Sequence, residues 1–242
     1  RTRLEEKHSR AKKILEQIIE NSAIAKKERL AICQDTGMPF VFVEVGRDVI
    51  VRGKGIADAI QQGINLGYSR GNFRDSVIKD PLRLKSQKSF FGPALVHYEH
   101  NNSHRLKITV LPKGVGCENK SKLKMFLPTA DLSEIKRFIL DAVKEAGADA
   151  CPPYVIGVGI GGSADYACLL AKKALLKSVV SRQSQVTSKI KQLERELLRD
   201  INKLGIGPMG LGGKTTALAV KVLTYPTHIA GLPVAVNISC HA

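Results

Sequence analysis

Apolar residues recur at steps of three and four in several parts of the chain, a spacing typical of helices with one buried face. In residues 2–29 that face would be formed by Leu4, Ala11, Ile14, Leu15, Ile18 and Ile19. The same spacing predicts helices over residues 56–66, 133–146, 164–179 and 184–204. The last of these also carries an excess of basic residues. It is therefore either a contact for a partner or a helix whose apolar stripe packs on its own domain.

Short apolar runs between these helices predict strands over residues 40–45, 49–51, 95–99, 106–111, 154–158, 215–225 and 232–239. The first two runs are separated by a turn at residues 46–48 and are predicted to form a hairpin. Residues 67–93 are rich in Gly, Ser, Asn and Pro and are predicted to be a long loop. Interleaved strands and helices indicate the α/β or α+β class. We expect an α/β fold, with residues 1–242 forming a single compact domain with a mixed sheet flanked by helices.

Composition and charge narrow the function classes. The 242 residues are 43% hydrophobic and 25% charged, which is ordinary for a globular protein and excludes a disordered or fibrous chain. No apolar run approaches the roughly 18 residues of a membrane span, and the first residues do not resemble a secretory signal. The formal net charge of +16 allows a nucleic-acid surface, an acidic substrate or an acidic protein partner. Its spread along the chain, with aromatic residues at only 5%, argues against the first of these.

The cysteine pattern indicates reduced thiols. Five cysteines are an odd number, and no export signal accompanies them, so a disulfide framework is not expected. No pair has the CxxC spacing of a zinc ribbon. We therefore expect a cytoplasmic protein whose thiols are free or serve as metal ligands.

Two glycine-rich motifs resemble nucleotide-binding loops but depart from them. Residues 157–162 satisfy GxGxxG, yet no acidic residue follows between Asp165 and Glu194, where the ribose-binding acid should stand. Residues 210–216 suggest a P-loop, but Pro208 occupies the position of its first glycine. Both motifs remain glycine loops suited to an anion.

Five motifs in sequence order carry a resemblance to a known family. They are residues 33–37 (CQDTG), 150–153 (ACPP), 159–163 (GIGGS), 205–213 (GIGPMGLGG) and 238–240 (ISC). In this order they resemble class I fumarases and L-tartrate dehydratases. The match is to the iron–sulfur hydro-lyase α subunit, or to the N-terminal domain of the single-chain enzymes, and it covers nearly the whole chain.

The resemblance implies a [4Fe-4S] cluster held by Cys33, Cys151 and Cys240. Three thiolates rather than four leave one iron open as a Lewis acid, and such an exposed iron is lost in air. Cys168 lies within an apolar helical stretch and is predicted to be a small buried core residue. Cys117 is predicted to lie near the cluster without ligating it.

The resemblance also implies a set of substrate residues. The family places an arginine for a substrate carboxylate at Arg74, a carboxylate-holding glycine turn at Gly114 and Gly116, and substrate contacts at Gln34 and Asp35. It places a histidine near the substrate at His228, and we take Asp35 and His228 as the catalytic candidates. From the residues alone, Arg74 could equally be a surface base, Asp35 a helix cap and His228 a loop histidine.

The function implied by the resemblance is hydration of fumarate to (S)-malate, a reaction of the tricarboxylic acid cycle. The alternative is an L-tartrate dehydratase α subunit, and a remote alternative from another class is a basic nucleic-acid-binding module. The family's base and several of its cationic substrate ligands come from a β subunit or a C-terminal domain. We therefore expect an α2β2 assembly with a dicarboxylate substrate, and neither a nucleic-acid nor a membrane partner.

Overall fold

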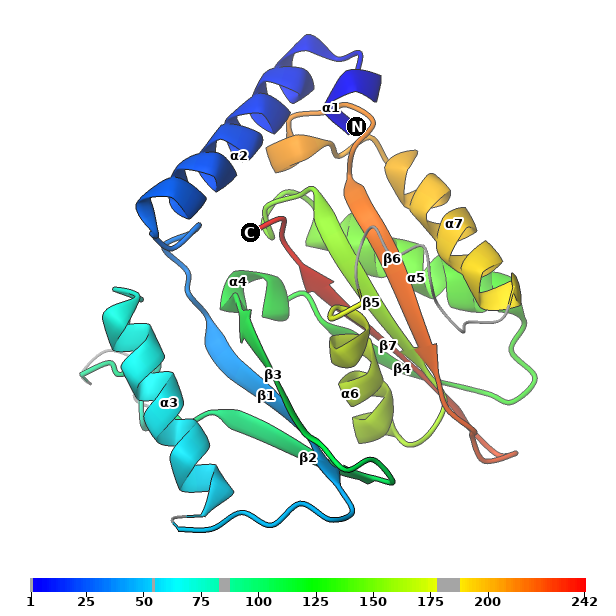
Figure 1. Cartoon of the computed structure of the whole chain (residues 1–242). Coiled ribbons are helices and arrows are strands. Elements are labelled where there is room, and N and C mark those ends of the chain that lie inside the picture. The colour runs from blue at the N-terminus through cyan, green and yellow to red at the C-terminus, as the bar shows by residue number, and fades with distance from the viewer. Residues whose placement is uncertain (1, 54, 83–87, 178–187) are drawn as a thin grey trace. The chain divides into compact units, whose positions relative to one another are not determined.

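The computed structural model describes residues 2–53, 55–82, 88–177 and 188–242 (Figure 1). These residues fall into two compact units. The larger unit comprises Arg1–Glu20 with Gly116–Ala242, and the smaller unit comprises Asn21–Val115. Each unit contains one mixed β-sheet flanked by helices. The predicted α/β class with helices flanking mixed β-structure is thereby confirmed, although the described strands form two mixed sheets where one was expected. A single domain over residues 1–242 stays a prediction.

The smaller unit is built on a three-stranded sheet in the order β2-β1-β3. Its strands are β1 (Met38–Gly46), β2 (Leu95–Asn101) and β3 (Leu106–Lys113). β1 pairs in parallel with β2 and antiparallel with β3. Helix α3 (Ile56–Arg70) places Ile60, Ile64 and Tyr68 against the β1 side chains Val41 and Val43, and these five residues form the buried core of the unit.

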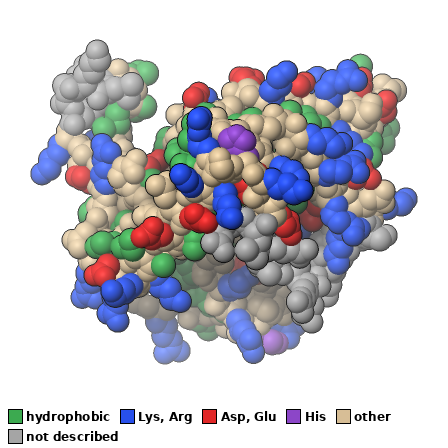
Figure 2. Space-filling model, turned by 90° about the horizontal axis from the view of Figure 1, so that it is seen from above, with side chains coloured by type: hydrophobic (Ala, Val, Ile, Leu, Met, Phe, Trp, Pro, Cys, Tyr) green, Lys and Arg blue, Asp and Glu red, His purple; other side chains and the backbone are tan. Residues whose placement is uncertain are grey.

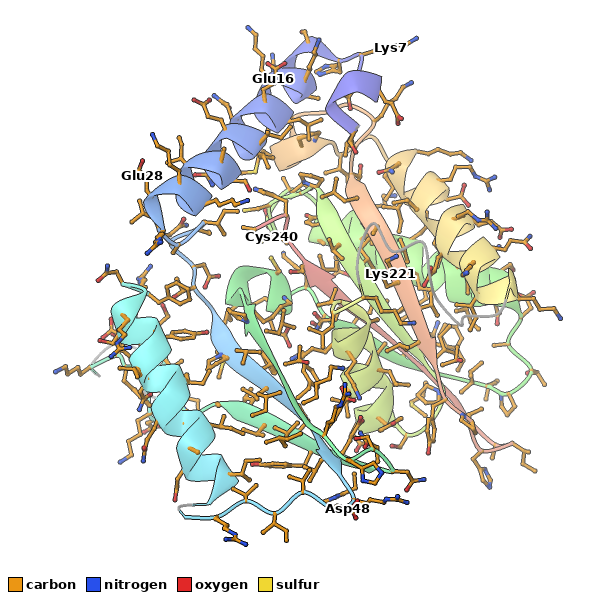
Figure 3. All side chains as sticks on the ribbon, in the orientation of Figure 1. Lys7, Glu16, Glu28, Asp48, Lys221 and Cys240 are labelled. Atoms are coloured by element: carbon orange, nitrogen blue, oxygen red, sulfur yellow. The ribbon has the colours of Figure 1, made fainter. Side chains whose placement is uncertain are left out.

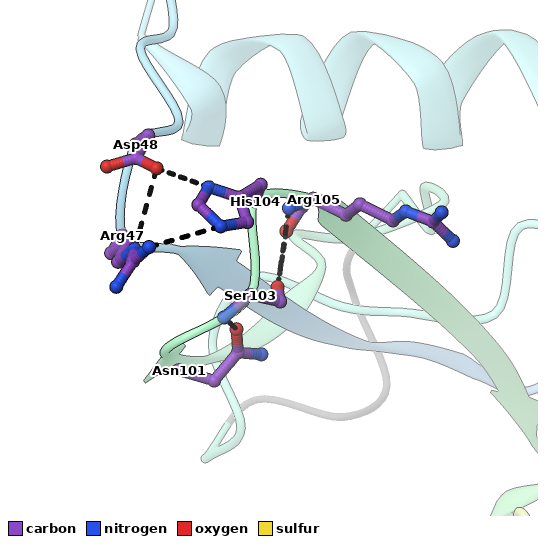
Figure 4. Close-up of polar contacts among 6 residues, drawn as sticks. All are labelled: Arg47, Asp48, Asn101, Ser103, His104 and Arg105. Atoms are coloured by element: carbon purple, nitrogen blue, oxygen red, sulfur yellow. Dashed lines mark hydrogen bonds and ion pairs between the residues drawn. The ribbon is translucent and has the colours of Figure 1, made fainter.

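The tip between β2 and β3 is tied to the turn that follows β1. The carboxylate of Asp48 contacts Nδ1 of His104, and a guanidinium nitrogen of Arg47 lies 3.2 Å from the other ring nitrogen of His104 (Figure 4). The backbone N–H of Arg47 also donates to the carbonyl of Ser103 over 2.9 Å. The turn after β1 is therefore anchored to the β2–β3 tip.

The larger unit contains a four-stranded sheet in the order β4-β7-β5-β6. Its strands are β4 (Lys122–Phe126), β5 (Tyr154–Ile160), β6 (Ala217–Thr224) and β7 (Leu232–Ser239). β5 and β6 are parallel, whereas β7 runs antiparallel to both β4 and β5. This unit also holds the short helices α1 (Thr2–Glu5) and η1 (Pro208–Gly210) and the start of α2 (Ser9–Glu28), and α4 (Val115–Glu118) lies where the two units join in the chain.

Helices cover both faces of the four-stranded sheet (Figure 1). On one face lie α5 (Leu132–Ala146) and α7 (Ser188–Asn202). Leu197 and Ile201 of α7 are fully buried there, so the apolar stripe of this basic helix packs on its own domain. Asp131 caps the start of α5, because its Oδ1 accepts the N–H of Glu134 over 2.9 Å.

Helix α6 (Ala164–Ala174) covers the opposite face by direct contact with the backbone of β5. A Cβ on Gly157 would lie 2.0 Å from the carbonyl oxygen of Ala171, and one on Gly159 would lie 2.1 Å from that of Ala167. No other residue fits at either position. The first two glycines of the GxGxxG motif therefore allow close packing of helix on strand.

Strand β6 forms one edge of this sheet, and polar side chains form hydrogen bonds with its outer backbone groups. Glu194 of α7 accepts the N–H of Val222 over 2.8 Å, and the ammonium group of Lys177 donates to the carbonyl of Val222 over 3.3 Å. Asn202 accepts the N–H of Ala217 over 2.8 Å. Side chains thus form hydrogen bonds with backbone groups of β6 that could otherwise pair with another strand at this edge.

The structure confirms most predicted elements and corrects others. The hairpin is wrong, because residues 49–51 form no strand and β1 pairs instead with two strands that follow much later in the sequence. Strand β4 was not predicted. The predicted loop at 67–93 begins with the last turn of α3 and contains a β-bridge between Val77 and Phe90. Residues 178–179 and 184–187, assigned to two predicted helices, lie outside the described residues.

Among the residues that the structure describes, none of the helices combines the length and apolarity that crossing a membrane requires.

Candidate functional site

The turn at residues 33–37 is fixed to the end of β3 by the carboxylate of Asp35. Its Oδ1 accepts the N–H of Gly37 over 3.1 Å, and its Oδ2 accepts the N–H of Val115 over 3.0 Å. Gly37 has φ +69°, and a Cβ there would lie 2.2 Å from the carbonyl oxygen of Lys113. Asp35 and Gly37 together hold the 33–37 turn against the turn that carries Gly114.

The loop that carries Arg74 is bonded to the same turn. The hydroxyl of Thr36 donates to the carbonyl of Arg74 over 3.1 Å, while the Arg74 side chain is exposed. The thiol of Cys33 donates to Oε1 of Gln34 over 3.3 Å. The smaller unit therefore brings the backbone of Arg74 and the turn at Gly114 to the turn that contains Cys33, Gln34 and Asp35. Their roles in substrate binding stay a prediction.

In the larger unit, Cys151 and Cys240 lie at one end of the four-stranded sheet. Cys151 shortly precedes β5, and Cys240 directly follows the antiparallel strand β7, whose Ser239 is paired with Val155. Figure 3 labels Cys240 at the end of β7. His241 links the two segments, since its Nδ1 lies 3.3 Å from the carbonyl oxygen of Cys151. Cys151 is exposed and Cys240 is partly exposed, and neither is in a disulfide.

Cys151 has a backbone conformation that L residues rarely adopt, with φ +55°. A left-handed conformation costs a non-glycine residue about 1–2 kcal/mol, so neighbouring contacts must maintain it. The N–H of Met209 donates to the carbonyl of Pro152 over 2.7 Å, and the N–H of Tyr154 donates to the carbonyl of Thr216 over 2.9 Å. Contacts to the chain at residues 209–216 thus hold the segment that follows Cys151.

Cys117 is buried in the core of the larger unit, beside the Cys151 turn. Its thiol lies 3.4 Å from the carbonyl oxygen of Ala150, to which it donates. It is thus adjacent to the predicted ligand segment without being reached by solvent. Whether it contacts a cluster stays a prediction.

A polar network behind Cys240 ties β7 to α4. The amide nitrogen of Asn237 donates to Glu118 and to Ser121, both over 3.0 Å, and Lys172 of α6 donates to Glu118 over 2.5 Å. Asn237 is only 4% exposed. This network fixes α4, the helix that contains Gly116, against the strand that leads to Cys240.

His228 lies at the other end of this sheet. It belongs to the loop between β6 and β7, where its Nδ1 accepts the N–H of Ala230 over 3.1 Å. The eight residues of β7 separate this loop from Cys240, a distance of about 25 Å along an extended strand. His228 is therefore not near Cys151 or Cys240 of the same chain. Its catalytic role stays a prediction.

The described residues contain no group of three His, Cys, Asp or Glu side chains arranged to hold a metal ion. The donor chemistry nevertheless fits an iron–sulfur cluster. Cys33, Cys151 and Cys240 are cysteines outside any disulfide, on turns beside strand ends and at least partly exposed. Two of them share one end of a sheet, and the third belongs to the smaller unit.

Comparison with known proteins identifies the family. The family model described as "Fumarate hydratase (Fumerase)" matches residues 1–242. This chain belongs to the fumarate hydratase family. Its relatives are named as fumarate hydratases and tartrate dehydratases, which are hydro-lyases, and the chain is therefore a hydro-lyase.

Three relatives illustrate the range of this fumarate hydratase family. A Methanocaldococcus jannaschii protein named "Putative L(+)-tartrate dehydratase subunit alpha" is 40% identical, over 96% of this chain and 82% of its own length. A Geobacillus stearothermophilus protein named "Putative fumarate hydratase class I" is 34% identical, over 97% of this chain and 46% of its own length. The Escherichia coli K12 "L(+)-tartrate dehydratase subunit alpha" is 27% identical, over 87% of this chain and 69% of its own length. The chain thus spans less than half of the Geobacillus protein.

One cysteine prediction for this fumarate hydratase family member is wrong. Cys168 was expected in the core, but its side chain is exposed on α6. The residues of that helix that face the sheet are instead Ala167 and Ala171. Cys168 follows Ala167 in the sequence and therefore points to a different side of the helix. An apolar helical sequence did not reveal which of its sides faces solvent.

Two histidines without a predicted role make contacts in the fold. His241 contacts the Cys151 turn, and its position directly after Cys240 was the available signal. His8 caps α2, because its Nδ1 accepts the N–H of Ala11 over 3.3 Å. A histidine just before a helical stretch was the corresponding signal there.

Proposed function

We propose that this chain is the α-type subunit of an iron–sulfur hydro-lyase that hydrates fumarate to (S)-malate. The match to the fumarate hydratase family over the whole chain carries this proposal. L-tartrate dehydration is the second candidate, favoured by the two relatives named as tartrate dehydratase α subunits.

Cys33, Cys151 and Cys240 would hold the [4Fe-4S] cluster, leaving one iron without a protein thiolate. Such an iron, when the cluster is bound, supplies a Lewis acid for the carboxylate and hydroxyl oxygens of the substrate. The positions of these three cysteines on partly exposed turns, outside any disulfide, support this ligand set. Cys168, on the outer side of α6, and the buried Cys117 are left out of it.

The substrate is a four-carbon dicarboxylate, whose two negative charges require cationic and N–H donors. Arg74 would bind one carboxylate through its guanidinium fork, and its exposed side chain supports that role. Gln34 would orient the substrate, and the N–H groups of the Gly114–Gly116 turn would donate to a carboxylate. Asp35 would keep this turn beside Gln34, as its bonds to Gly37 and Val115 suggest.

Hydration of fumarate adds the hydroxyl of water to one alkene carbon and a proton to the neighbouring carbon. We propose that Asp35, the carboxylate of the turn that carries Cys33 and Gln34, holds the proton exchanged at the hydroxyl oxygen. The group that exchanges the proton at carbon would come from a β subunit. His228 could join the site only from a neighbouring molecule, given its distance from its own cysteines.

A β partner in an α2β2 assembly is supported by the relatives named as α subunits. The basic surface suits either an acidic partner or the anionic substrate, since the formal net charge is +16. In Figure 2 the basic side chains on the visible face are dispersed among acidic and neutral ones, which does not favour a nucleic-acid track. Five cysteines, none of them in a disulfide, support a reducing compartment such as the cytoplasm.

The test is anaerobic reconstitution of the chain with iron and sulfide, followed by addition of the β subunit. We expect a brown protein that is nearly inactive alone and that hydrates fumarate once the β subunit is added. Association should slow as the salt concentration rises, because opposite charges steer the encounter. Fumarate and L-tartrate are assayed side by side to separate the two candidate activities.

Three outcomes would contradict the proposal. A colourless anaerobic protein that retards DNA would favour a nucleic-acid-binding module. Robust hydration by the isolated chain would refute a site completed by the β subunit. Tartrate dehydration without fumarate hydration would establish the second candidate.

A further inference from the structure

A carboxylate of the chain itself fills the glycine loop at residues 210–216. Oε2 of Glu6 accepts the N–H of Lys214 over 2.8 Å and the hydroxyl of Thr215 over 3.3 Å. Its Oε1 accepts the N–H of His8 over 3.0 Å. Glu6 is 5% exposed and Thr215 is 4% exposed. The loop that resembles a phosphate-binding motif therefore already has an anion, which comes from the opposite end of the chain.

The donors around Glu6 suit a charged carboxylate. Burial alone would raise the pKa of Glu6. Hydrogen bonds from the backbone N–H groups of His8 and Lys214 and from the Thr215 hydroxyl together outweigh burial, so the pKa of Glu6 is lowered. Glu6 is therefore ionised at neutral pH.

The loop is shaped to admit this N-terminal segment. Gly213 has φ +104°, and a Cβ there would lie 2.6 Å from the Cβ of Ala11 and 3.0 Å from Oε2 of Glu6. Ala11 is completely buried. A side chain at position 213 would displace both the helix and the carboxylate, so glycine is required for the contact.

The same loop supports the segment that contains Cys151. Met209 donates to the carbonyl of Pro152, and the carbonyl of Thr216, one residue after Thr215, accepts the N–H of Tyr154. Direct contacts thus connect Glu6, through residues 209–216, to Pro152 and Tyr154, which follow Cys151 in the chain. They are available to maintain the left-handed φ of Cys151.

We propose that residues 210–216 form an anion-binding loop whose built-in ligand is the carboxylate of Glu6, and that Glu6 thereby acts as a positioning residue for Cys151. When Glu6 is removed, the same N–H and hydroxyl donors are available to a small free carboxylate such as formate. The role of Cys151 as a cluster ligand rests on the proposed function. The anion site does not depend on that function.

The experiment uses the full chain without a cluster and compares Glu6→Ala with Glu20→Ala, a matched change at an exposed glutamate of α2. Thermal unfolding is followed while sodium formate is titrated against sodium chloride at equal ionic strength. We expect Glu6→Ala to have a lower Tm and formate to restore part of it with saturation. Formate should stabilise neither the wild-type chain nor Glu20→Ala beyond the effect of chloride.

The second readout is the alkylation rate of Cys151, measured by peptide mass spectrometry relative to exposed Cys168. Glu6→Ala removes all three hydrogen bonds to the carboxylate. If the free energy of one of them reaches the Cys151 segment, the local opening equilibrium changes about tenfold. We therefore expect alkylation of Cys151 to become about tenfold faster in Glu6→Ala and to slow again in formate. Rescue by a free carboxylate distinguishes an anion site from a merely structural residue.

Glu6→Gln serves as a second variant, since it keeps an acceptor oxygen and should fold even if Glu6→Ala does not. Its Tm and Cys151 alkylation rate should lie between those of the wild type and Glu6→Ala. A folded Glu6 variant without a specific formate effect would overturn the anion site. Unchanged Cys151 alkylation would overturn the positioning role. Neither readout needs cluster or activity, so failure of the proposed function would be seen separately.

Discussion

Replacing Asp35 tests whether a carboxylate holds the turn that carries Cys33 in place. Both oxygens of Asp35 accept backbone N–H groups, one from Gly37 in its own turn and one from Val115, eighty residues later in the chain. Asp35→Ala removes both acceptors, while Asp35→Asn retains one oxygen and presents an amide NH2 to the other N–H. Asp75→Ala is the control, because Asp75 is an exposed aspartate of the same unit.

The magnitude follows from these two bonds. A hydrogen bond to a charged group contributes about 1.5–3 kcal/mol, and water can replace part of this at a half-buried side chain. The lower end of that range gives a loss of about 3 kcal/mol for Asp35→Ala and about 1.5–2 kcal/mol for Asp35→Asn. An exposed control should change stability by no more than about 0.5 kcal/mol.

The assay is urea unfolding of the full chain without cluster, with hydrogen exchange measured by mass spectrometry. Exchange should accelerate in peptides containing Gly37 and Val115 and remain unchanged in the peptide containing Asp75. A stability loss in Asp35→Ala no larger than that of the control would refute the reasoning. So would unchanged exchange at Gly37 and Val115, even if hydratase activity were lost.

Three further outcomes are expected. Serine substitutions should prevent loading of four irons, measured as iron and sulfide per chain, at Cys33, Cys151 and Cys240, whereas Cys117→Ser and Cys168→Ser should load fully. Arg74→Lys should lower kcat/KM of the assembled enzyme at least ~10-fold, because an ammonium group cannot replace a bidentate guanidinium; unchanged kinetics would return Arg74 to the ordinary surface. Burial raises the pKa of Tyr68 to about 12, so its protonated form stabilises the fold below pH 10, and about 2–3 kcal/mol should be lost as the pH rises from 10 towards 12. Tyr68→Phe should remove that part of the alkaline loss in a pH series of unfolding measurements.

Much of the local structure could be predicted from the sequence. The helices near residues 56–70 and 132–146 follow from apolar spacing, and the strands near residues 154–160 and 232–239 follow from apolar runs. The false hairpin arose because a turn signal after β1 says nothing about whether the chain reverses onto the same sheet edge. Strand β4 escaped notice because Lys122–Phe126 is short and alternates lysine with apolar residues.

The candidate site could be predicted only in part from the sequence. The motif order indicated the family and the three cysteines. In the smaller unit, the backbone of Arg74 and the turn at Gly114 lie against the turn that contains Cys33 and Asp35, while their roles stay predictions. The separation of His228 from Cys240 depends on strand direction, which motif spacing does not reveal. Twelve residues that include a whole strand place two side chains at opposite ends of a sheet.

The sequence by itself determined the family and the type of most elements, because motifs and hydrophobic periodicity are local properties of the chain. Tertiary structure alone decided three features: the pairing of β1 with two later strands, the exposure of Cys168, and the contact of Glu6 with a loop 208 residues away. Each of these depends on which distant surfaces pack together. That choice minimises buried unpaired polar groups over the whole molecule, and no local stretch of sequence encodes it.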